Sequence, residues 1–276
     1  FGIAKRETNA PIRTEHKNLA IAIQNVIEEI FLKLATHIKS LTQCNNLCIS
    51  GGCALNCSAM GKIKGSGLFS NVFVPFAPGD DGGAIGAALV FHALMSGKRY
   101  MSDISPYQGC SFKNEEVERA IKEENLEFNF VQEENLYDEI AFSLSHGNIV
   151  GWFQGRMEFG PRALGNRSIL ADPRVFSMKD RVNAKVKYRE AFRPFAPVVT
   201  QDDASHFFED SSSPFMMFTT QVRIDTTLIP AVTHVDNTAR IQTVTETSNI
   251  RLYKLLKAFE NYSKIPILLN TSFNVM

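Results

Sequence analysis

The chain has 276 residues, of which 44% are hydrophobic and 21% are charged. This composition excludes a disordered or fibrous protein, and the length exceeds that of an average single core, so two domains are expected. Lys plus Arg equals Asp plus Glu at 29 each, which argues against a general binder of nucleic acid or of membrane surfaces.

The cysteines and the termini indicate the compartment. The chain has five cysteines, four of them between Cys44 and Cys57, and this odd number predicts free thiols in a reducing compartment. No apolar run is as long as a membrane-spanning helix, and no signal-peptide pattern opens the chain. We therefore predict a cytoplasmic protein. Because the chain starts at Phe1 and stops at Met276 directly after an apolar segment, we also expect it to be a fragment, truncated at both ends.

The N-terminal part alternates helical and extended patterns. Apolar residues recur at steps of three and four along residues 16–41, which predicts a long amphipathic helix. Two short apolar runs follow, each ending in a glycine-rich turn before another helical segment. The expected elements are helices at 16–41, 54–64 and 84–95 and strands at 47–49 and 71–75. This order predicts an α/β sheet whose ligands bind at the turns after the strands.

A domain boundary is expected near residue 104, because residues 97–108 are rich in Gly, Ser, Asp and Pro. The predicted domains are 1–104 and 105–276. In the second domain the pattern predicts helices at 114–123, 137–145 and 248–262 and strands at 148–153, 215–222, 241–244 and 265–269.

The two glycine-rich turns of the first domain are candidate ligand sites. Residues 50–56 (SGGCALN) place Gly51 and Gly52 after a strand, where a ligand can approach the backbone. Residues 78–83 contain Asp80 and Asp81, which can bind a metal or a ribose. The alternatives are a tight turn without a ligand for the first segment and a helix N-cap for the second.

Residues 154–197 form a basic segment with a distinct pattern. Its arginines alternate with apolar residues and turn-forming residues, so they are expected to be partly buried and to need anionic partners such as phosphate. A solvated basic face is the alternative. The arginines are Arg156, Arg162, Arg167, Arg174, Arg181, Arg189 and Arg193.

Five motifs together resemble the O-carbamoyltransferases of the nodulation protein U and tobramycin carbamoyltransferase family. They are residues 50–56, 79–88 (GDDGGAIGAA), 155–168 (GRMEFGPRALGNRS), 187–197 (KYREAFRPFAP) and 269–274 (LNTSFN). The resemblance implies an α/β fold with two parts. The first is one lobe of an actin, Hsp70 and sugar-kinase-like (ASKHA) domain, and the second is a YrdC-like twisted-sheet domain.

For the first domain, the resemblance implies that Gly51, Gly52 and Asn56 contact the nucleotide of an activated carbamoyl group. It also implies that Asp80 binds a divalent catalytic metal, iron or a similar ion. The family's other metal ligands include a His-x-x-x-His motif. That motif does not occur in this chain, so the metal site is expected to be incomplete here.

For the second domain, the resemblance implies that Lys187 and Arg189 meet Ser272 and Asn274 around phosphate and adenylate. Glu158 is expected to orient an arginine. The expected phosphate-clamping, catalytic residues are Lys187, Arg189, Arg156, Arg162 and Arg167. The expected cofactor-binding residues are Ser272, Asn274, Asn270 and Arg193.

The implied reaction converts ATP and carbamoyl phosphate into carbamoyl adenylate and then transfers the carbamoyl group to a hydroxyl of a small-molecule acceptor. No nucleic-acid or membrane partner is expected, and a homodimer is left open. The fragment alone is expected to be inactive in the full reaction. The alternatives are an enzyme of threonylcarbamoyl-type tRNA modification and a nucleotide-binding module without turnover.

Overall fold

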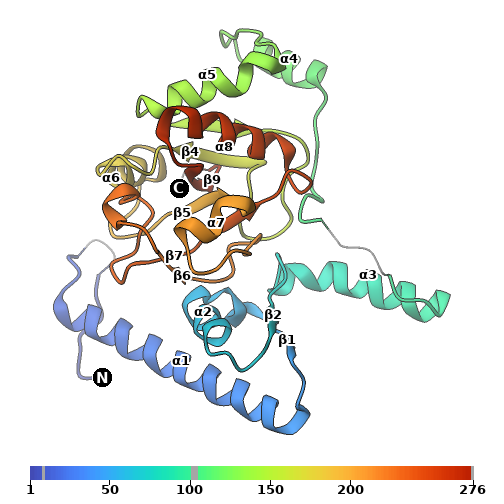
Figure 1. Cartoon of the computed structure of the whole chain (residues 1–276), viewed down its shortest axis with the longest axis vertical. Helices are drawn as coiled ribbons and strands as arrows, with labels where there is room; N and C mark the ends of the chain where they lie inside the picture. Colours follow the sequence, from blue (N-terminus) through green and yellow to red (C-terminus); the bar gives the residue numbers. More distant parts are fainter. Residues whose placement is uncertain (8–9, 101–104, 275–276) are drawn as a thin grey trace.

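The computed structural model describes residues 1–7, 10–100 and 105–274 of the chain. These residues form an α/β structure, as expected from the sequence. A five-stranded sheet lies at the centre of the C-terminal part, and the N-terminal elements form a separate layer beside it (Figure 1). The boundary expected after residue 104 falls on residues 101–104, outside the described residues, and the same holds for residues 275–276 at the expected truncated end.

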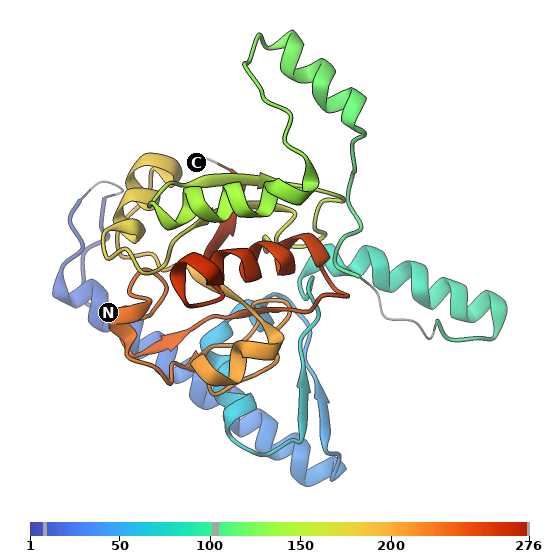
Figure 2. The ribbon, with the colours of Figure 1, turned by 45° about the horizontal axis from the view of Figure 1, so that its top comes forward.

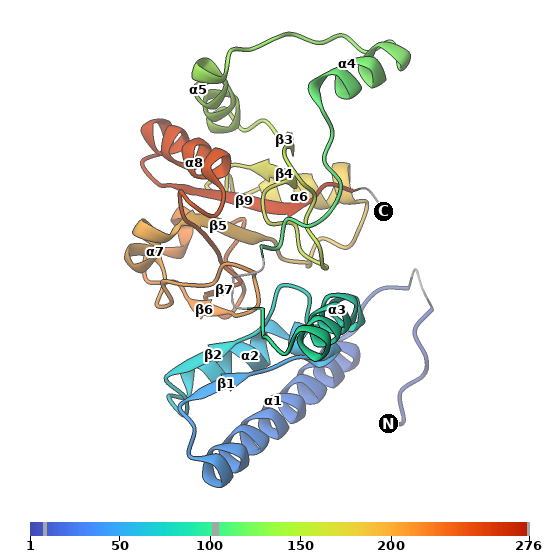
Figure 3. The same cartoon turned by 90° about the vertical axis from the view of Figure 1, so that its right-hand side faces the viewer.

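The N-terminal layer contains three helices and a two-stranded parallel sheet in which Leu47 pairs with Val72 (Figure 3). Its elements are α1 (Thr14–Thr42), β1 (Asn46–Cys48), α2 (Cys57–Gly65), β2 (Asn71–Phe73) and α3 (Asp80–Ser96), with a 3₁₀ turn at Gly52–Leu55. The predicted elements of this part are all present within a few residues of the expected ends. Ala35, Ala59, Met60 and Ile63 form much of its core because one face of α1 packs on α2.

The larger sheet has the strand order β3-β4-β9-β5-β8. Its strands are β3 (Val150–Phe153), β4 (Arg167–Ala171), β5 (Ala196–Thr200), β8 (Gln242–Val244) and β9 (Ile267–Ser272). Only the β5–β8 pair is parallel, and the other three pairs are antiparallel. Strand β9 therefore lies in the middle of the sheet, where both of its edges are paired.

Both faces of this sheet are buried over β4, β5, β8 and most of β9, and successive residues of the strands alternate between the faces. Ile267 and Leu269 pack into one apolar cluster, together with residues of α6 (Met178–Val182) and α7 (Gln201–Phe207). Leu268 packs into the opposite cluster, under α5 (Glu133–Ser145) and α8 (Ile250–Ser263). The result is a layer of helices on each side of the sheet.

The remaining elements are short or stand apart from the body. Helix α4 (Asn114–Glu123) and helix α3 have no buried residue, and both project away from the rest of the chain (Figure 2). The others are β6 (Thr220–Gln221), β7 (Thr238–Ala239), a π turn at Asn183–Lys187 and a 3₁₀ turn at Thr226–Leu228.

The predicted strand at 215–222 is wrong over most of its length, because only residues 220 and 221 are extended in β6. Met216 has a φ of 58°, which a β-strand cannot accommodate. Met217 and Phe218 instead pack into the core of the N-terminal layer, and Phe215 meets Phe76 edge to face at 5.6 Å. This segment thus attaches the N-terminal layer to the sheet.

Candidate functional site

Three arginines from different parts of the chain line one small pocket of about 130 Å³ next to the end of β9. They are Arg162, Arg189 and Arg240, and Asn270, Thr271 and Ser272 of β9 also line it. We call this the arginine pocket. No Asp or Glu is among the residues that line it. A concentration of guanidinium groups without a carboxylate is the arrangement expected for a phosphate site.

Arg162 is a strongly desolvated cation in this pocket. Burial, together with the smaller effect of the positive charge of Arg240, lowers the pKa of its guanidinium to about 10. Its Nη2 donates to the carbonyl oxygen of Leu55 at 3.4 Å, whereas its Nε is buried without a hydrogen-bond partner. A buried cation that lacks an anionic partner is costly. The side chain is therefore suited to a ligand that brings negative charge.

Arg189 and Arg240 are also desolvated. Burial lowers the pKa of Arg189, and the nearby Arg193 and Arg240 add to that effect. Its guanidinium lies 4.8 Å from the ring centre of Phe195, and its Nε donates to Asn183 Oδ1 at 2.7 Å. Burial likewise lowers the pKa of Arg240, partly offset by Cys57 beside it. These contacts hold the guanidinium groups in place without neutralising them.

Glu158 organises the loop that carries Arg162. Its side chain is 8% exposed, and its Oε1 accepts hydrogen bonds from the backbone N–H groups of Leu164 at 2.7 Å, Asn166 at 2.8 Å and Arg167 at 3.2 Å. The sequence suggested that Glu158 orients an arginine side chain. In the structure its carboxylate instead binds the backbone that follows Arg162 in the sequence, and these hydrogen bonds fix the shape of the loop.

Lys187 lies next to the pocket and is 3% exposed. Its Nζ donates to the carbonyl oxygen and Oγ of Ser272 at 2.5 and 3.0 Å, and to the carbonyl oxygen and Oδ1 of Asn274 at 2.9 and 2.8 Å. Burial lowers the pKa of this amine to about 8, and Arg189 contributes in the same direction. The structure thus brings together Lys187, Ser272 and Asn274, while Arg189 lines the same pocket as Ser272.

The structure does not bring all the expected phosphate-binding cations to this pocket. Arg156 donates to the carbonyl oxygens of Gly109 and Gln108 at 3.1 and 3.0 Å. Arg167 opens β4 opposite Phe153, so its guanidinium stacks on that ring at 3.5 Å and donates to the carbonyl oxygen of Gln154 at 2.7 Å. Both arginines are held by backbone carbonyls near the 108–110 segment. The expectation of one cleft containing all five catalytic cations is therefore corrected to Arg162 and Arg189, with Lys187 beside them.

Arg193 also lies outside the residues that line the pocket. It forms an ion pair with Glu190 at 2.9 Å, in which both side chains are about half exposed. Its charge lowers the pKa of Arg189, so it lies close to the arginine pocket. A direct contact of Arg193 with a cofactor stays a prediction.

The glycine-rich turns of the N-terminal layer contact each other. Gly51 has a φ of 102°, and its N–H donates to the carbonyl oxygen of Pro78 at 2.6 Å. Gly52 is exposed, and no atom lies within 4 Å of the position of an added Cβ. The side chain of Asn56 is engaged as the N-cap of α2, where it accepts from the Ala59 N–H at 3.2 Å and donates to Gln24 Oε1 at 3.0 Å. Asn56 therefore has a structural role, and nucleotide contacts of the three residues stay a prediction.

Asp80 is exposed at the start of α3. Over residues 1–7, 10–100 and 105–274, no three His, Cys, Asp or Glu side chains are grouped closely enough to hold a metal ion. Asp80 has the oxygen chemistry of a metal ligand, but the described residues supply no co-ligands. The incomplete metal site stays a prediction.

Comparison with known proteins identifies the family. Residues 2–89 match the family model described as carbamoyltransferase N-terminus, and residues 141–276 match the one described as carbamoyltransferase C-terminus. The chain belongs to the carbamoyltransferase family. The family resemblance read from the motifs is thereby confirmed, and all the residues that line the arginine pocket lie in the part that matches the carbamoyltransferase C-terminus.

Relatives within the carbamoyltransferase family include proteins from several bacteria. The chain is 40% identical to nodulation protein NolO of Bradyrhizobium diazoefficiens, over 99% of this chain and 51% of the relative. It is 37% identical to 3'-hydroxymethylcephem-O-carbamoyltransferase of Streptomyces clavuligerus, over 96% of this chain and 49% of the relative. The chain thus spans about half the length of these relatives.

Arg240 is the pocket residue that the sequence did not indicate. It lies outside the basic segment and outside every motif that resembles the carbamoyltransferases. The only sequence signal is a lone arginine between Ala239 and Ile241, both of which are buried.

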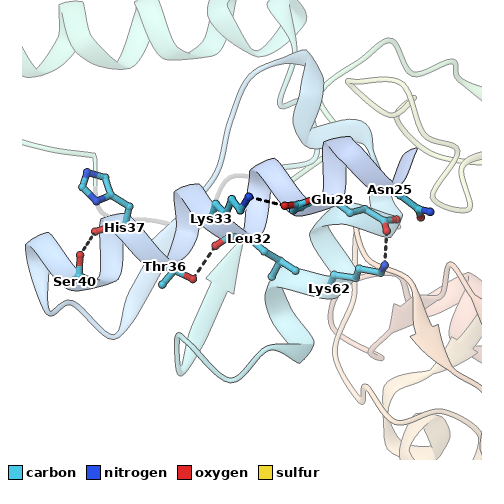
Figure 4. A pocket seen from close by; sticks show the side chains of 9 residues that line it. Asn25, Glu28, Leu32, Lys33, Thr36, His37, Ser40 and Lys62 are labelled. Carbon is cyan, nitrogen blue, oxygen red and sulfur yellow. Dashed lines mark hydrogen bonds and ion pairs between the residues drawn. The ribbon is translucent and has the colours of Figure 1, made fainter. Parts of the chain in front are cut away.

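A second depression, of about 650 Å³, runs along α1. Its charged residues are paired with one another: Glu28 with Lys62, and Glu29 with Lys33 (Figure 4). These ion pairs cancel the charge that an ionic ligand would need, so this larger depression is a weaker candidate than the arginine pocket.

No helix within residues 1–7, 10–100 and 105–274 has both the length and the apolar character needed to span a membrane.

Replacing Gly160 with alanine is expected to lower the free energy of unfolding by about 1–3 kcal/mol. Gly160 has a φ of 107°, and an added Cβ would lie 2.6 Å from the backbone oxygen of Phe76. The change therefore strains the contact between the Arg162 loop and the N-terminal layer. Thermal denaturation measures the effect. Gly52→Ala is the matched control, since no atom lies within 4 Å of its added Cβ. Equal melting temperatures for the two variants would contradict the close contact.

Proposed function

We propose that this chain supplies the carbamoyl-activating site of an O-carbamoyltransferase and that the arginine pocket binds the phosphate of carbamoyl phosphate. The observation that carries the proposal is the convergence of Arg162, Arg189 and Arg240 on a pocket lined by no Asp or Glu. Membership of the carbamoyltransferase family supports the choice of carbamoyl phosphate as that compound. ATP is a less suitable ligand for this pocket, because its adenosine would extend out of a volume of about 130 Å³.

In the proposed reaction, water cleaves carbamoyl phosphate to carbamate and inorganic phosphate. A carbamate oxygen then attacks the α-phosphate of ATP, which forms carbamoyl adenylate and releases pyrophosphate. A hydroxyl group of the acceptor finally attacks the carbamoyl carbon, so that the carbamoyl ester forms and AMP leaves. In the second step two anions, carbamate and ATP, must approach one another. The arginines lower that barrier because they are fixed cations in a desolvated site.

The transfer step belongs to the ASKHA-like part in this proposal, and activation belongs to the YrdC-like part. A divalent metal held partly by Asp80 would polarise an oxygen of the acceptor or of the carbamoyl group. A small-molecule hydroxyl acceptor is supported by the relative whose name specifies a 3'-hydroxymethylcephem. We further propose a cytoplasmic enzyme without nucleic-acid or membrane partners.

The test is to incubate the purified chain with ATP and carbamoyl phosphate and to measure pyrophosphate. We expect pyrophosphate release that needs both substrates and no acceptor, because activation is assigned to residues within this chain. ATP binding without pyrophosphate release would support a nucleotide-binding module instead. Release that needs threonine and bicarbonate in place of carbamoyl phosphate would support the tRNA-modification alternative.

A further inference from the structure

The outer edge of β2 has no partner strand in the described part of the chain, because its two-stranded sheet contains only β1 beside it. On the inner side, Asn71 N–H donates to the carbonyl oxygen of Asn45 at 3.2 Å. The carbonyl oxygen of Phe73 accepts from Ile49 N–H at 2.9 Å. Because the backbone groups of successive residues point to opposite edges of a strand, the N–H and C=O of Val72 point to the outer edge.

A groove of about 490 Å³ lies along this edge, and we call it the edge groove. It is lined by residues 69–74, which include all of β2, and by residues 212–215. Ser213 in this lining is 1% exposed, and its Oγ has no hydrogen-bond partner among the described residues. The edge groove therefore suits an extended segment that brings apolar side chains and main-chain hydrogen bonds. Its phenylalanines are Phe69, Phe73, Phe215 and Phe218.

The connection between α4 and α5 contains a segment of matching chemistry. Residues 126–130 (LEFNF) alternate apolar and polar side chains, which is the two-residue period of a strand. The structure nevertheless places residues 126–132 in no helix or strand, and all of them are exposed, Phe130 at 82%. Within the described part of the chain, the backbone of residues 127–131 forms no hydrogen bond. We call residues 126–131 the arm.

The arm lies far from the edge groove of its own chain. It ends at α5, which packs on α8 beside the large sheet, whereas β2 lies in the N-terminal layer, well away from α4 and α5 (Figures 1 and 3). An arm that reaches this groove must therefore come from a second copy. Residues 65–79, which contain β2, include no charged residue, so this edge lacks the charges that keep free strand edges from pairing with other chains.

We propose that the arm of one copy adds as a strand to the outer edge of β2 in a second copy. The main chain of the arm pairs with Val72, and its phenylalanines lie among those of the edge groove. Reciprocal exchange closes a two-fold dimer, in which each copy gives one arm and accepts one. This inference goes beyond the proposed function and does not depend on it, because neither the arm nor the edge groove contains a residue of the arginine pocket.

Light scattering of the purified chain at rising concentration tests the exchange, and the expected mass at high concentration is that of two chains. Phe130→Ser should raise the dissociation constant of the dimer at least about tenfold, because it removes a large apolar side chain from the edge groove of the other copy. Phe176→Ser is the matched control. Phe176 is 83% exposed but lies in neither the arm nor the edge groove, so its variant should dimerise like the unaltered chain.

A second pair of variants tests the strand edge. Val72→Pro removes the N–H that points to the outer edge and leaves the hydrogen bonds to β1 in place, so it should weaken the dimer at least about tenfold. Cys48→Pro is the control, since the N–H of Cys48 points to the outer edge of β1 by the same alternation. A labelled peptide with the sequence of residues 124–132 (ENLEFNFVQ) should bind the Phe130→Ser variant, whose edge groove is unaltered, and should fail to bind Val72→Pro.

Three results would overturn the exchange. The first is a chain that stays monomeric at every concentration. The second is a dimer that Phe130→Ser and Phe176→Ser weaken equally, since its interface would then lie outside the arm. The third is a dimer that Cys48→Pro weakens as much as Val72→Pro does, because the outer edge of β2 would then have no special part in it. The two phenylalanine variants change exposed side chains, so their comparison decides the matter even if Val72→Pro does not fold.

Discussion

Arg240→Ala is expected to weaken the binding of inorganic phosphate and of carbamoyl phosphate by about tenfold or more. A charge-assisted hydrogen bond to an anion contributes about 1.5–3 kcal/mol, and tenfold in affinity corresponds to about 1.4 kcal/mol. Arg240 lines the arginine pocket, where no carboxylate neutralises it. Removing Arg240 should therefore remove its whole contribution to the binding free energy of phosphate. Calorimetric titration of the variant measures the change.

The same substitution should leave the melting temperature unchanged or raise it. The charge of Arg240 lowers the pKa of Arg162 and of Arg189, so the Arg240 guanidinium repels each of the other two guanidinium groups. Removing one of them relieves that repulsion, so stability and phosphate affinity should move in opposite directions. A merely structural arginine would show the reverse, because its loss would lower both.

Lys185→Ala is the matched control for this prediction. Lys185 belongs to the same basic segment but is exposed and does not line the pocket. Its variant should bind phosphate within about twofold of the unaltered chain, since an exposed charge is screened by solvent and salt. If both variants lose the same affinity, a diffuse basic surface binds the anion and the arginine pocket is wrong.

The longer helices and the strands β1, β2, β3, β8 and β9 could be predicted because their signals are local, whereas the short helices α6 and α7 were not predicted. The apolar period along α1 and the glycine after each short strand depend only on neighbouring residues. Strand β4 and strand β5 were not predicted. Each is five residues long, and each is buried by helices from distant parts of the chain. Their sequences therefore lack the alternation that marks a half-buried strand.

The sequence predicted the chemistry of the site, but it did not predict which arginines line the pocket. Alternation of arginine with apolar residues predicted partly buried cations, and Arg162 and Arg189 are partly buried and line the arginine pocket. The same pattern does not distinguish an arginine that faces a pocket from one that binds nearby carbonyl oxygens, as Arg156 and Arg167 do. Arg240 joins the pocket only through the folding of the sheet. The spacing of residues along the sequence does not indicate that Arg240 meets the segments that carry Arg162 and Arg189.

Lys187→Ala is expected to lower pyrophosphate release from ATP and carbamoyl phosphate by about a hundredfold or more, since loss of an electrostatic contact in a preorganised site costs about 2.7–4 kcal/mol. Two effects combine. The variant loses a cation beside the arginine pocket, and it releases Ser272 and Asn274 from the four hydrogen bonds that Nζ makes to them. The end of β9 should then lose its fixed position.

The pH dependence supplies an independent check on Lys187. Burial lowers the pKa of Lys187 to about 8 from the ordinary 10.5, so the amine loses its charge as the pH rises through about 8. If the charged form is needed, kcat/KM for pyrophosphate release should fall above that pH, because kcat/KM reports the free enzyme. A bound phosphate favours the charged amine, and the fall in kcat should therefore appear at higher pH. A flat kcat/KM profile between pH 7 and 9 would contradict a role for the charge.

Asp80→Ala should leave pyrophosphate release unchanged, and it is the counterpart of Lys187→Ala in the proposed division of the reaction. Asp80 is exposed at the start of α3 and is not among the residues of the arginine pocket. Its proposed metal acts only when the acceptor attacks. Neither substitution empties an apolar core, so both variants should fold, which circular dichroism can verify before the assay. If Asp80→Ala suppresses pyrophosphate release as strongly as Lys187→Ala does, activation and transfer share one site. The assignment of the two steps to different parts of the chain would then have to be abandoned.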